Sequence, residues 1–388
     1  MKKFFSVKDF SNKFSKGETK MTFDFFMPVK VISGKGAVLK SGEEFRKKGR
    51  SFLIVTGGSS AAKSGALDDV CSVLKEIGAE YKVYDKIGPN PLIENCHEAA
   101  QIAIGMNADC IIGIGGGSPM DAAKAVSIYA VNAGCSPEDI YAFPSGTEHL
   151  PLILVGTTSG TGSEVSGVSV LTNGATGRKK SIGGIYADIS FGCPEYTNTM
   201  PYSVTVSTAV DALSHAVEGW FSPKISDSVK VFAVKGLPMI YSALKKLVET
   251  KELPDEKGRE KLYYGSLYAG MVLNACGTAF PHPMGYVLTE DYGFPHGFAC
   301  GAFLPYLAER GEKYAPEKAE ELFELISSDL KEFTDLLKKA VDISKVSMTE
   351  EEALSYSNRW ENQKNFKIVP GGYTKEDAFE LLKKLFVK

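Results

Sequence analysis

Residues 110–121, CIIGIGGGSPMD, decide how the first half of the chain folds. The apolar run from Cys110 to Ile114 predicts a buried strand, and the three glycines from Gly115 to Gly117 end that strand. Three glycines in a row also let backbone N–H groups approach a ligand closely. The stretch predicts a strand, a glycine turn and a helix, in the order typical of parallel α/β sheets.

The helix after this turn is expected to begin at Pro119. We expect Ser118 to be its N-cap, Pro119 its first residue, and Asp121 the partner of Ser118 in a capping box. The N-terminus of such a helix carries partial positive charge, which favours binding of a pyrophosphate. A tight turn without a ligand remains an alternative, because the pattern is not GxGxxG.

The same alternation extends on both sides of this stretch. Further strands are predicted at residues 52–55, 81–84 and 152–155, with helices at residues 67–77 and 94–106. After Pro201 the spacing becomes helical, with helices expected at residues 204–220, 227–248, 256–276 and 298–310. We therefore expect an extension at residues 1–20, an α/β dinucleotide-binding domain with a parallel sheet at residues 21–202, and an all-helical metal-binding domain at residues 203–388.

The amino-acid composition excludes several classes of binding partner. The chain has 388 residues, more than one compact core usually holds, with 44 basic and 47 acidic side chains and a net charge of −3. This balance argues against nucleic acid or an anionic membrane as a partner. No secretory signal or apolar run of about 18 residues is found. The seven cysteines are dispersed, which favours reduced thiols. We expect a cytoplasmic protein that acts on small molecules.

Two further polar turns follow predicted strands. Residues 157–164, TTSGTGSE, offer several hydroxyl and N–H donors, although a plain flexible loop is an alternative. Gly57, Ser59 and Ser60, with Lys63 beyond, follow the first strand of the domain. An acidic residue at position 57 would bind a ribose 2′-OH and repel a 2′-phosphate. Glycine there, with nearby hydroxyls, favours NADP(H), and NAD remains possible.

Four side chains in the second half have the spacing of metal ligands. Asp211 and His215 are four residues apart, so they lie on one face of a helix. His282 and His296 each lie beside glycine and proline. One carboxylate and three imidazoles suit Fe(II) or Zn(II). Alternatives remain when the residues are taken singly. Asp211 and His215 can be an exposed pair on a helix, and a single histidine is more often packed or solvated than bound to a metal.

These motifs together resemble the iron-containing (group III) alcohol dehydrogenases, over roughly residues 23–305. The resemblance is carried by GGGSPMDAAKAV (115–126), TTSGTGSE (157–164), DALSHAVEGW (211–220) and the spacing from His282 to His296 and Gly297. It implies a dehydroquinate-synthase-like fold, with cofactor and metal meeting between the domains. Members are commonly homodimers or larger, and residues 23–36 resemble an N-terminal strand pair that often crosses between subunits.

The resemblance also implies roles for single residues. Asp211, His215, His282 and His296 correspond to the metal ligands. The residues that correspond to cofactor contacts are Asn90, Gly116, Gly117, Ser118, Asp121, Thr157, Thr158, Thr161, Ser163 and Lys179.

The chain departs from the family pattern near its third ligand. Tyr286 stands where many members carry a second histidine, sometimes given a proton-relay role, so we assign no catalytic acid or base. Pro281 and Pro283 flank His282 and can displace it.

The expected activity is that of a metal-dependent, NADP(H)-linked alcohol dehydrogenase. Its substrates are expected to be short primary alcohols, diols and their aldehydes. A lyase of the dehydroquinate synthase type, or a weakened or non-catalytic nucleotide-binding relative, remains an alternative.

Overall fold

The computed structural model describes residues 23–387 and contains one large parallel sheet. Each neighbouring pair of strands in this sheet is parallel. In spatial order its strands are β1 (Lys30–Ser33), β8 (Ile189–Gly192), β5 (Leu152–Gly156), β4 (Cys110–Gly115), β2 (Ser51–Thr56) and β3 (Glu80–Tyr84). The strands predicted from apolar runs are all present, within two residues of their expected ends.

Helices cover both faces of the sheet, because successive strand residues point to opposite sides. Phe52 and Ile54 of β2 pack with the helices of one face, and Leu53 and Val55 pack with those of the other. The first face is covered by α2 (Gly42–Arg46), α3 (Ser60–Lys63) and α4 (Ala66–Glu76). The second is covered by α5 (Ile93–Gly105), α6 (Gly117–Val131) and the 3₁₀ turn η1 (Pro137–Tyr141).

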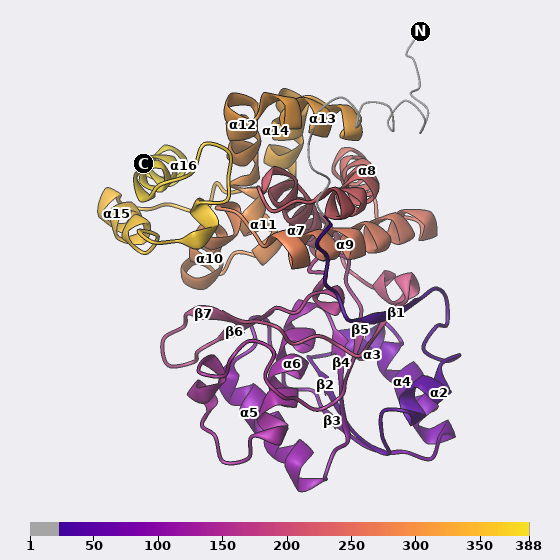
Figure 1. Ribbon diagram of the computed structural model, residues 1–388. Coiled ribbons are helices and arrows are strands. Elements are labelled where there is room, and N and C mark those ends of the chain that lie inside the picture. The colour runs from indigo at the N-terminus through magenta and orange to yellow at the C-terminus, as the bar shows by residue number, and fades with distance from the viewer. Residues whose placement is uncertain (1–22, 388) are drawn as a thin grey trace.

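A small antiparallel hairpin lies between the sheet and the rest of the molecule (Figure 1). Its strands are β6 (Ser169–Thr172) and β7 (Lys179–Ile182). The 3₁₀ turn η2 (Ser163–Val165) precedes it, and η3 (Pro194–Thr197) follows β8.

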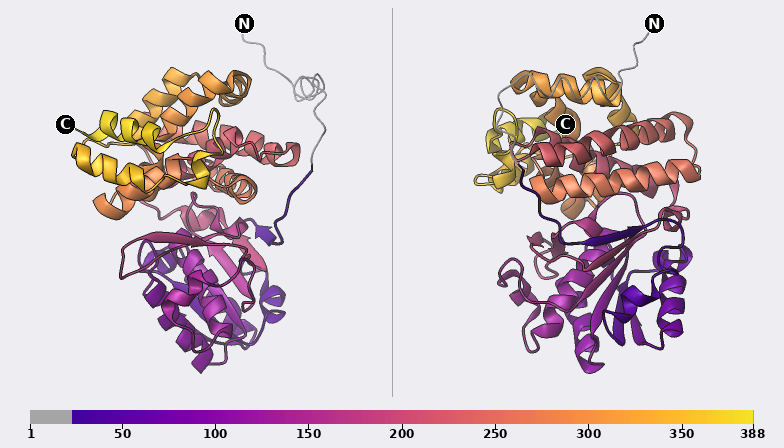
Figure 2. Two further views of the ribbon diagram at one scale, coloured as in Figure 1. Left: turned by 60° about the vertical axis from the view of Figure 1, so that its left-hand side comes forward. Right: turned by 45° about the vertical axis from the view of Figure 1, so that its right-hand side comes forward.

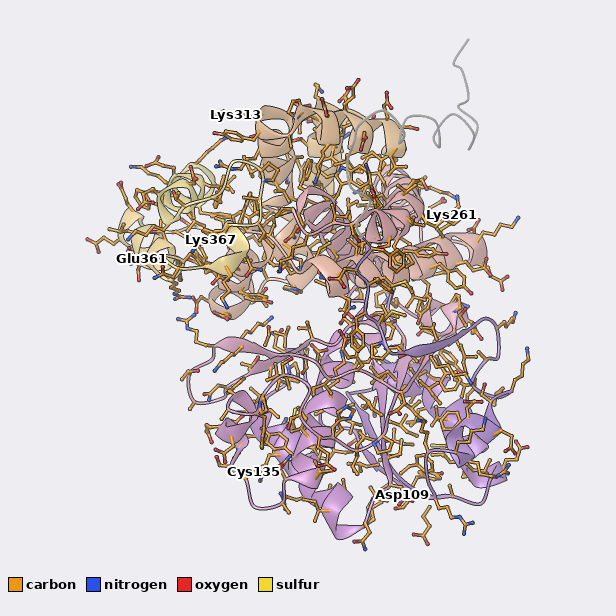
Figure 3. All side chains as sticks on the ribbon, viewed as in Figure 1. Asp109, Cys135, Lys261, Lys313, Glu361 and Lys367 are labelled. Carbon is orange, nitrogen blue, oxygen red and sulfur yellow. The ribbon has the colours of Figure 1, made fainter. Side chains whose placement is uncertain are left out.

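From Tyr202 onward the described chain is helical (Figure 2). These helices build their own apolar core. Its helices are α7 (Tyr202–Phe221), α8 (Asp227–Thr250), α9 (Glu256–Cys276), α10 (Pro281–Tyr292), α11 (His296–Gly301), α12 (Leu304–Tyr314), α13 (Pro316–Ile326), α14 (Leu330–Ala340), α15 (Glu350–Asn358) and α16 (Lys375–Phe386), with the 3₁₀ turn η4 (Lys364–Phe366). Exposed charged side chains such as Lys261, Lys313 and Lys367 point outward from this part (Figure 3).

The predicted fold class is confirmed: a parallel α/β sheet is followed by an all-helical part. The sheet ends at Gly192 and the first long helix begins at Tyr202; the assignment of residues 21–202 and 203–388 as separate domains stays a prediction. None of the helices in residues 23–387 is long and apolar enough to span a membrane. The expected extension at residues 1–20 lies outside the described residues.

Two expectations about single elements were wrong. Residues 298–310 form parts of two helices, α11 and α12, and Pro305 lies in the first turn of α12, where a missing N–H costs nothing. Residues 23–36 contain one strand, β1, not a strand pair, and β1 pairs with β8 of the same chain. Crossing of this segment between subunits stays a prediction.

Candidate active site

The four predicted metal ligands come together where three helices meet. Asp211 and His215 lie one turn apart on α7, while His282 and His296 lie at the starts of α10 and α11. Oδ1 of Asp211 is 3.9 Å from Nε2 of His215 and 3.8 Å from Nε2 of both other histidines. The Nε2 atoms of His215 and His282 are 3.0 Å apart. One oxygen and three nitrogens therefore face one another.

The Asp211 carboxylate indicates that this cluster is built for a cation. Oδ1 of Asp211 is buried and has no hydrogen-bond partner among the described residues. A buried oxygen left unpaired costs about 1–3 kcal/mol, and more when it is charged. Burial disfavours the charge on Asp211, but the three nearby histidines and Lys179 together outweigh burial and lower the pKa of Asp211. The donor set and the unpaired oxygen both fit a divalent metal ion.

Burial keeps two of the imidazoles neutral at physiological pH. It lowers the pKa of His215 to about 4 and that of His296 to about 3, against the opposing influence of Asp211. A neutral imidazole is the form that binds a metal. The His296 side chain is 30% exposed, whereas the side chains of Asp211, His215 and His282 are at most 6% exposed, so the cluster opens on the side of His296.

Two glycines allow the helices that carry these ligands to approach one another. A Cβ on Gly297 would lie 1.9 Å from the carbonyl oxygen of Ser207 on α7. A Cβ on Gly285 would lie 3.0 Å from the backbone of Ala299 on α11. The prolines beside His282 lie in the first turn of α10, which tolerates them. The expectation that these prolines can displace His282 is not met, because His282 lies within the cluster.

Glu218 is a site residue that the sequence reasoning missed. Its Oε1 is 2.6 Å from Nδ1 of His282, and its Oε2 accepts a 2.6 Å hydrogen bond from the N–H of Ala279. A carboxylate on Nδ1 leaves Nε2 free to bind a cation, and it fixes the orientation of the ring. Its position three residues after His215, on the same face of α7, is a signal that could have identified it.

Tyr286 and Lys179 form a layer next to His296. The ring of Tyr286 stacks on that of His296 at 5.6 Å, and the Lys179 ammonium lies 5.3 Å from the centre of the Tyr286 ring. Burial raises the pKa of Tyr286 to about 12 and lowers the pKa of Lys179. Lys179 is the first residue of β7 and is predicted to contact the cofactor. Its position over Tyr286 places the start of β7 at the edge of the candidate metal site.

The three polar turns lie side by side at one edge of the sheet. They follow β5, β4 and β2, which are neighbours, and the carboxyl ends of parallel strands share an edge. A Cβ on Gly116 would lie 3.1 Å from Thr158, and one on Gly117 would lie 2.7 Å from Thr161. The N–H of Thr157 donates to the Gly115 carbonyl. These contacts bring the turns after β4 and β5 together.

Asn90 joins the same group from the loop after β3. Its N–H donates to the Ser118 hydroxyl at 3.2 Å, and its φ of 57° is the left-handed conformation that asparagine tolerates. The structure thus gathers Asn90, Gly116, Gly117, Ser118, Thr157, Thr158 and Thr161 at one place.

The expected capping box at residues 118–121 is wrong. The N-cap of α6 is Gly116 and the helix starts at Gly117, so Ser118 lies inside its first turn. The Asp121 carboxylate accepts hydrogen bonds from the Ser163 hydroxyl at 2.6 Å and from the N–H of Val170 at 2.9 Å. Asp121 and Ser163 therefore bind each other, and this pairing ties α6 to η2 and β6.

Lys124 is another residue that sequence reasoning missed. It reinforces the connection of α6 to η2. Its fully buried ammonium donates to the Ser163 carbonyl and hydroxyl and to the carbonyls of Ser166 and Val168, at 2.7–2.9 Å. Burial lowers the pKa of Lys124 to about 8. The loop after β5 is thereby held from beneath by α6.

The backbone packing around position 57 requires glycine there. A Cβ there would lie 2.2 Å from the Ile87 carbonyl oxygen, so any side chain at this position would force the backbone to shift. Ser59 and Ser60, in contrast, are exposed beside it.

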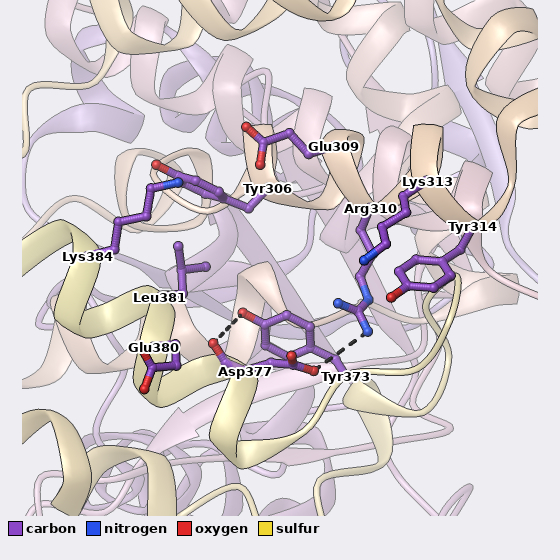
Figure 4. A pocket seen from close by; sticks show the side chains of 10 residues that line it. All are labelled: Tyr306, Glu309, Arg310, Lys313, Tyr314, Tyr373, Asp377, Glu380, Leu381 and Lys384. Atoms are coloured by element: carbon purple, nitrogen blue, oxygen red, sulfur yellow. Dashed lines mark hydrogen bonds and ion pairs between the residues drawn. The ribbon is translucent and has the colours of Figure 1, made fainter.

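A separate pocket of about 420 Å³ lies between α12 and α16, and none of the predicted site residues lines it (Figure 4). Arg310 lies over the rings of Tyr314 and Tyr373, and it pairs with Asp377 at 3.6 Å. Lys313 and Lys384, which also line this pocket, lie over the rings of Tyr314 and Tyr306.

Comparison with known families confirms the resemblance. Residues 28–191 match the family described as iron-containing alcohol dehydrogenase, and residues 205–359 match its C-terminal family. The chain belongs to the iron-containing alcohol dehydrogenases. The family assignment confirms the prediction made from the four sequence motifs.

Individual relatives cover most of the chain. A 1,3-propanediol dehydrogenase of Klebsiella pneumoniae is 31% identical, over 84% of this chain and 86% of its own. An NADPH-dependent butanol dehydrogenase of Clostridium saccharobutylicum is 30% identical, over 78% of each chain. An NAD-dependent methanol dehydrogenase of Bacillus methanolicus is 27% identical, over 93% of this chain and 92% of its own.

The fold is also shared with solved structures. An iron-containing alcohol dehydrogenase of Thermotoga maritima superposes with a TM-score of 0.87 at 33% identity, over 94% of this chain and 99% of the other.

Proposed function

We propose that this member of the family is an NADP(H)-linked alcohol dehydrogenase that interconverts short primary alcohols or diols with their aldehydes. The observation that carries the proposal is the convergence of Asp211, His215, His282 and His296 around one unpaired buried oxygen. We propose these four side chains as ligands of Fe(II), with Zn(II) as the alternative. Family membership favours this function over a lyase of the dehydroquinate synthase type.

The candidate cofactor loops and the candidate metal site are in contact. A Cβ on Gly160, in the loop after β5, would lie 2.7 Å from Thr208. Thr208 lies one turn before Asp211 on α7. A nucleotide bound across the turns after β5, β4 and β2 would therefore have one end beside the four ligands.

When bound, the cation would supply a Lewis acid for a carbonyl or alcohol oxygen, and the nicotinamide would supply or accept the hydride. Glu218 holds His282 by its Nδ1 and keeps Nε2 directed into the cluster. Burial of His215 and His296 keeps both rings unprotonated and excludes water from all but the His296 side. Tyr286, with its pKa near 12, stays protonated at neutral pH and covers the His296 ring.

The preference for NADP(H) is supported by the residues at the end of β2. The close approach of Ile87 leaves no space for an acidic side chain at position 57. The exposed hydroxyls of Ser59 and Ser60 are available to a 2′-phosphate. The relatives include both NADPH-dependent and NAD-dependent enzymes.

We also propose that the protein is a homodimer or larger. β1 is an edge strand of the sheet, and Phe23 and Phe26 before it are 85% and 65% exposed. Light scattering of the purified protein would test this, and a single 41.9 kDa species would contradict it.

The activity is tested by metal analysis and kinetics on the same purified protein. After anaerobic loading with Fe(II), we expect about one ion per chain and reduction of butanal and 3-hydroxypropanal with NADPH. Asp211→Asn should lose both the ion and turnover, whereas Glu260→Gln, an exposed change on α9, should keep both. A wild-type protein that binds no metal and turns over no aldehyde would refute the proposal.

Cofactor preference is tested separately. We expect kcat/KM to be at least about tenfold higher with NADPH than with NADH. Ser59→Asp should reverse this preference by repelling the 2′-phosphate, whereas Ser72→Asp, exposed on α4, should leave it unchanged. A large wild-type preference for NADH would overturn the assignment of Ser59 and Ser60.

A further inference from the structure

A further potential donor lies beside three of the four candidate ligands, Asp211, His282 and His296. Cys300 lies one turn after His296 on α11, so both side chains share one face of that helix. The Cys300 sulfur is 3.8 Å from each ring nitrogen of His296, and Cys300 is fully buried. No role has been assigned to this thiol in the function proposed above.

The geometry of the cluster admits the thiol as a ligand. One donor atom from each of Asp211, His282, His296 and Cys300 lies within 4.8 Å of all the others. Bond lengths of about 2.0–2.3 Å place two donors on one tetrahedral ion roughly 3.3–3.8 Å apart. The unpaired Oδ1 of Asp211 lies 3.8 Å from Nε2 of both His282 and His296, so it points into the same space.

We propose that Cys300 is a metal ligand that shares the cation with Asp211, His282 and His296. This rests on the metal site of the proposed function and adds a sulfur to it. As the metal–sulfur bond forms, the S–H bond breaks and the proton leaves to solvent, with no change in oxidation state. A thiolate is a soft ligand and favours Zn(II) over Fe(II) relative to an all-nitrogen and oxygen site.

Coordination by the Cys300 thiolate would also affect the access of substrate to the metal. A catalytic site keeps one coordination position open, and Cys300 would compete for that position with an alcohol or aldehyde oxygen. Cys300 therefore acts on both the choice of metal and access of substrate to it.

The direct test is the absorption spectrum of the Co(II)-loaded protein. Wild type should show the near-ultraviolet charge-transfer band of a thiolate–cobalt bond, and Cys300→Ser and Cys300→Ala should both lack it. Cys276→Ser is the matched control, because Cys276 is equally buried but lies in the apolar core. It should keep the band. Two variants are used at position 300 so that a folding failure of one of them does not decide the test. Circular dichroism shows whether each variant is folded.

A competition experiment gives an independent readout. Wild type offered equal Zn(II) and Fe(II) should bind a ratio of zinc to iron at least about tenfold higher than Cys300→Ser does. Co(II) bound at one ion per wild-type chain, lost in Asp211→Asn, but without the thiolate band would overturn the role of Cys300 and leave the metal site intact. A wild-type protein that binds no Co(II) would overturn both proposals.

Discussion

Glu218 controls how His282 presents its ring. Its two oxygens make two separate bonds, one to Nδ1 of His282 and one to the N–H of Ala279. A neutral amide at this position has one acceptor oxygen, so it can keep only one of these bonds. The residue thus acts on the candidate metal site through His282, without facing the metal itself.

We expect Glu218→Gln to weaken metal binding by about 10–100-fold, because outer partners of ligating histidines typically contribute this much. The measurement is the dissociation constant for Zn(II) or Co(II) in competition with a chelator. Glu260→Gln, which removes an exposed carboxylate, should leave the constant unchanged. Equal affinities in all three proteins would show that Glu218 does not orient His282.

The lowered pKa of His215 makes the stability of the metal-free protein depend on pH. The unfolded chain protonates this histidine near pH 6.5, whereas burial delays protonation in the folded chain until about pH 4. Between these values the unfolded state binds more protons. The free energy of unfolding therefore falls as pH falls from about 6.5 toward 4, and this histidine has no effect above 6.5.

We expect His215→Gln to remove about 1.4 kcal/mol per pH unit of this slope, the value for one proton. Urea unfolding of metal-free wild type and variant at several pH values between 4.5 and 8 measures it. The pKa of His282 is raised by Cys300 and Glu218 despite burial. Because both proteins contain His282, it does not cause the expected difference between their pH profiles. Parallel pH profiles for the two proteins would contradict the prediction.

At the level of elements, the contact between α7 and α11 decides whether the site exists. Asp211 lies on α7, while His296 and Cys300 lie on α11. The two helices meet at Gly297, where a methyl group would overlap the Ser207 carbonyl. The absence of a side chain there is what brings Asp211 and His296 within 3.8 Å.

We expect Gly297→Ala to separate these helices, lower the free energy of unfolding by about 1–3 kcal/mol and impair metal binding. Gly105→Ala is the matched control, since Gly105 ends α5 and a methyl group there meets open space. That change should be neutral or slightly stabilising. Thermal unfolding and metal content of both variants test this; normal metal binding by Gly297→Ala would show that α11 can adjust.

At the scale of the whole molecule, charged residues connect the hairpin to the helical part. Arg178, before β7, pairs with Glu290 at 2.8 Å and with Asp291 at 3.3 Å on α10. Arg359, after α15, pairs with the same two acids at 3.8 Å and 3.3 Å. The helix that carries His282 is thereby tied to the strand that carries Lys179.

We expect Arg178→Ala to increase amide hydrogen exchange in residues 173–182 while changing overall stability by less than about 1 kcal/mol. The small effect follows because the Arg178 side chain is 46% exposed and solvent screens its charge. Lys180→Ala in the same hairpin is the control, because Lys180 lies over the ring of Tyr141 and is exposed. Equal exchange in the two variants would show that the ion pairs do not hold the hairpin.

Much of the fold was predictable because its signals are local. Apolar runs such as 110–114 and 152–155 are strands because buried parallel strands are apolar on both faces. The predicted helix at residues 256–276 has the bounds of α9. The capping box at Ser118 failed because Asp121 found a partner in Ser163, 42 residues away, which no local pattern reveals.

The candidate site was predictable only in part. Asp211 and His215 share a helix face, so their pairing follows from spacing alone. Their meeting with His282 and His296 was inferred from family resemblance, because it depends on how α7, α10 and α11 pack. Glu218, Lys124 and Cys300 were missed, since a buried carboxylate, ammonium or thiol has no meaning until its partners are known. The cytoplasmic location and the subunit number stay predictions.

The fold class, the family and the four candidate ligands could be predicted from the order of the amino acids alone. These depend on short-range patterns of apolar residues, glycine and histidine, which are written along the chain. Three further features emerge in the folded chain: Gly297 lets α11 lie against α7, Glu218 holds His282, and the Cys300 sulfur faces the same space as Asp211. Such contacts join residues distant in sequence, and their geometry follows from the packing of whole helices.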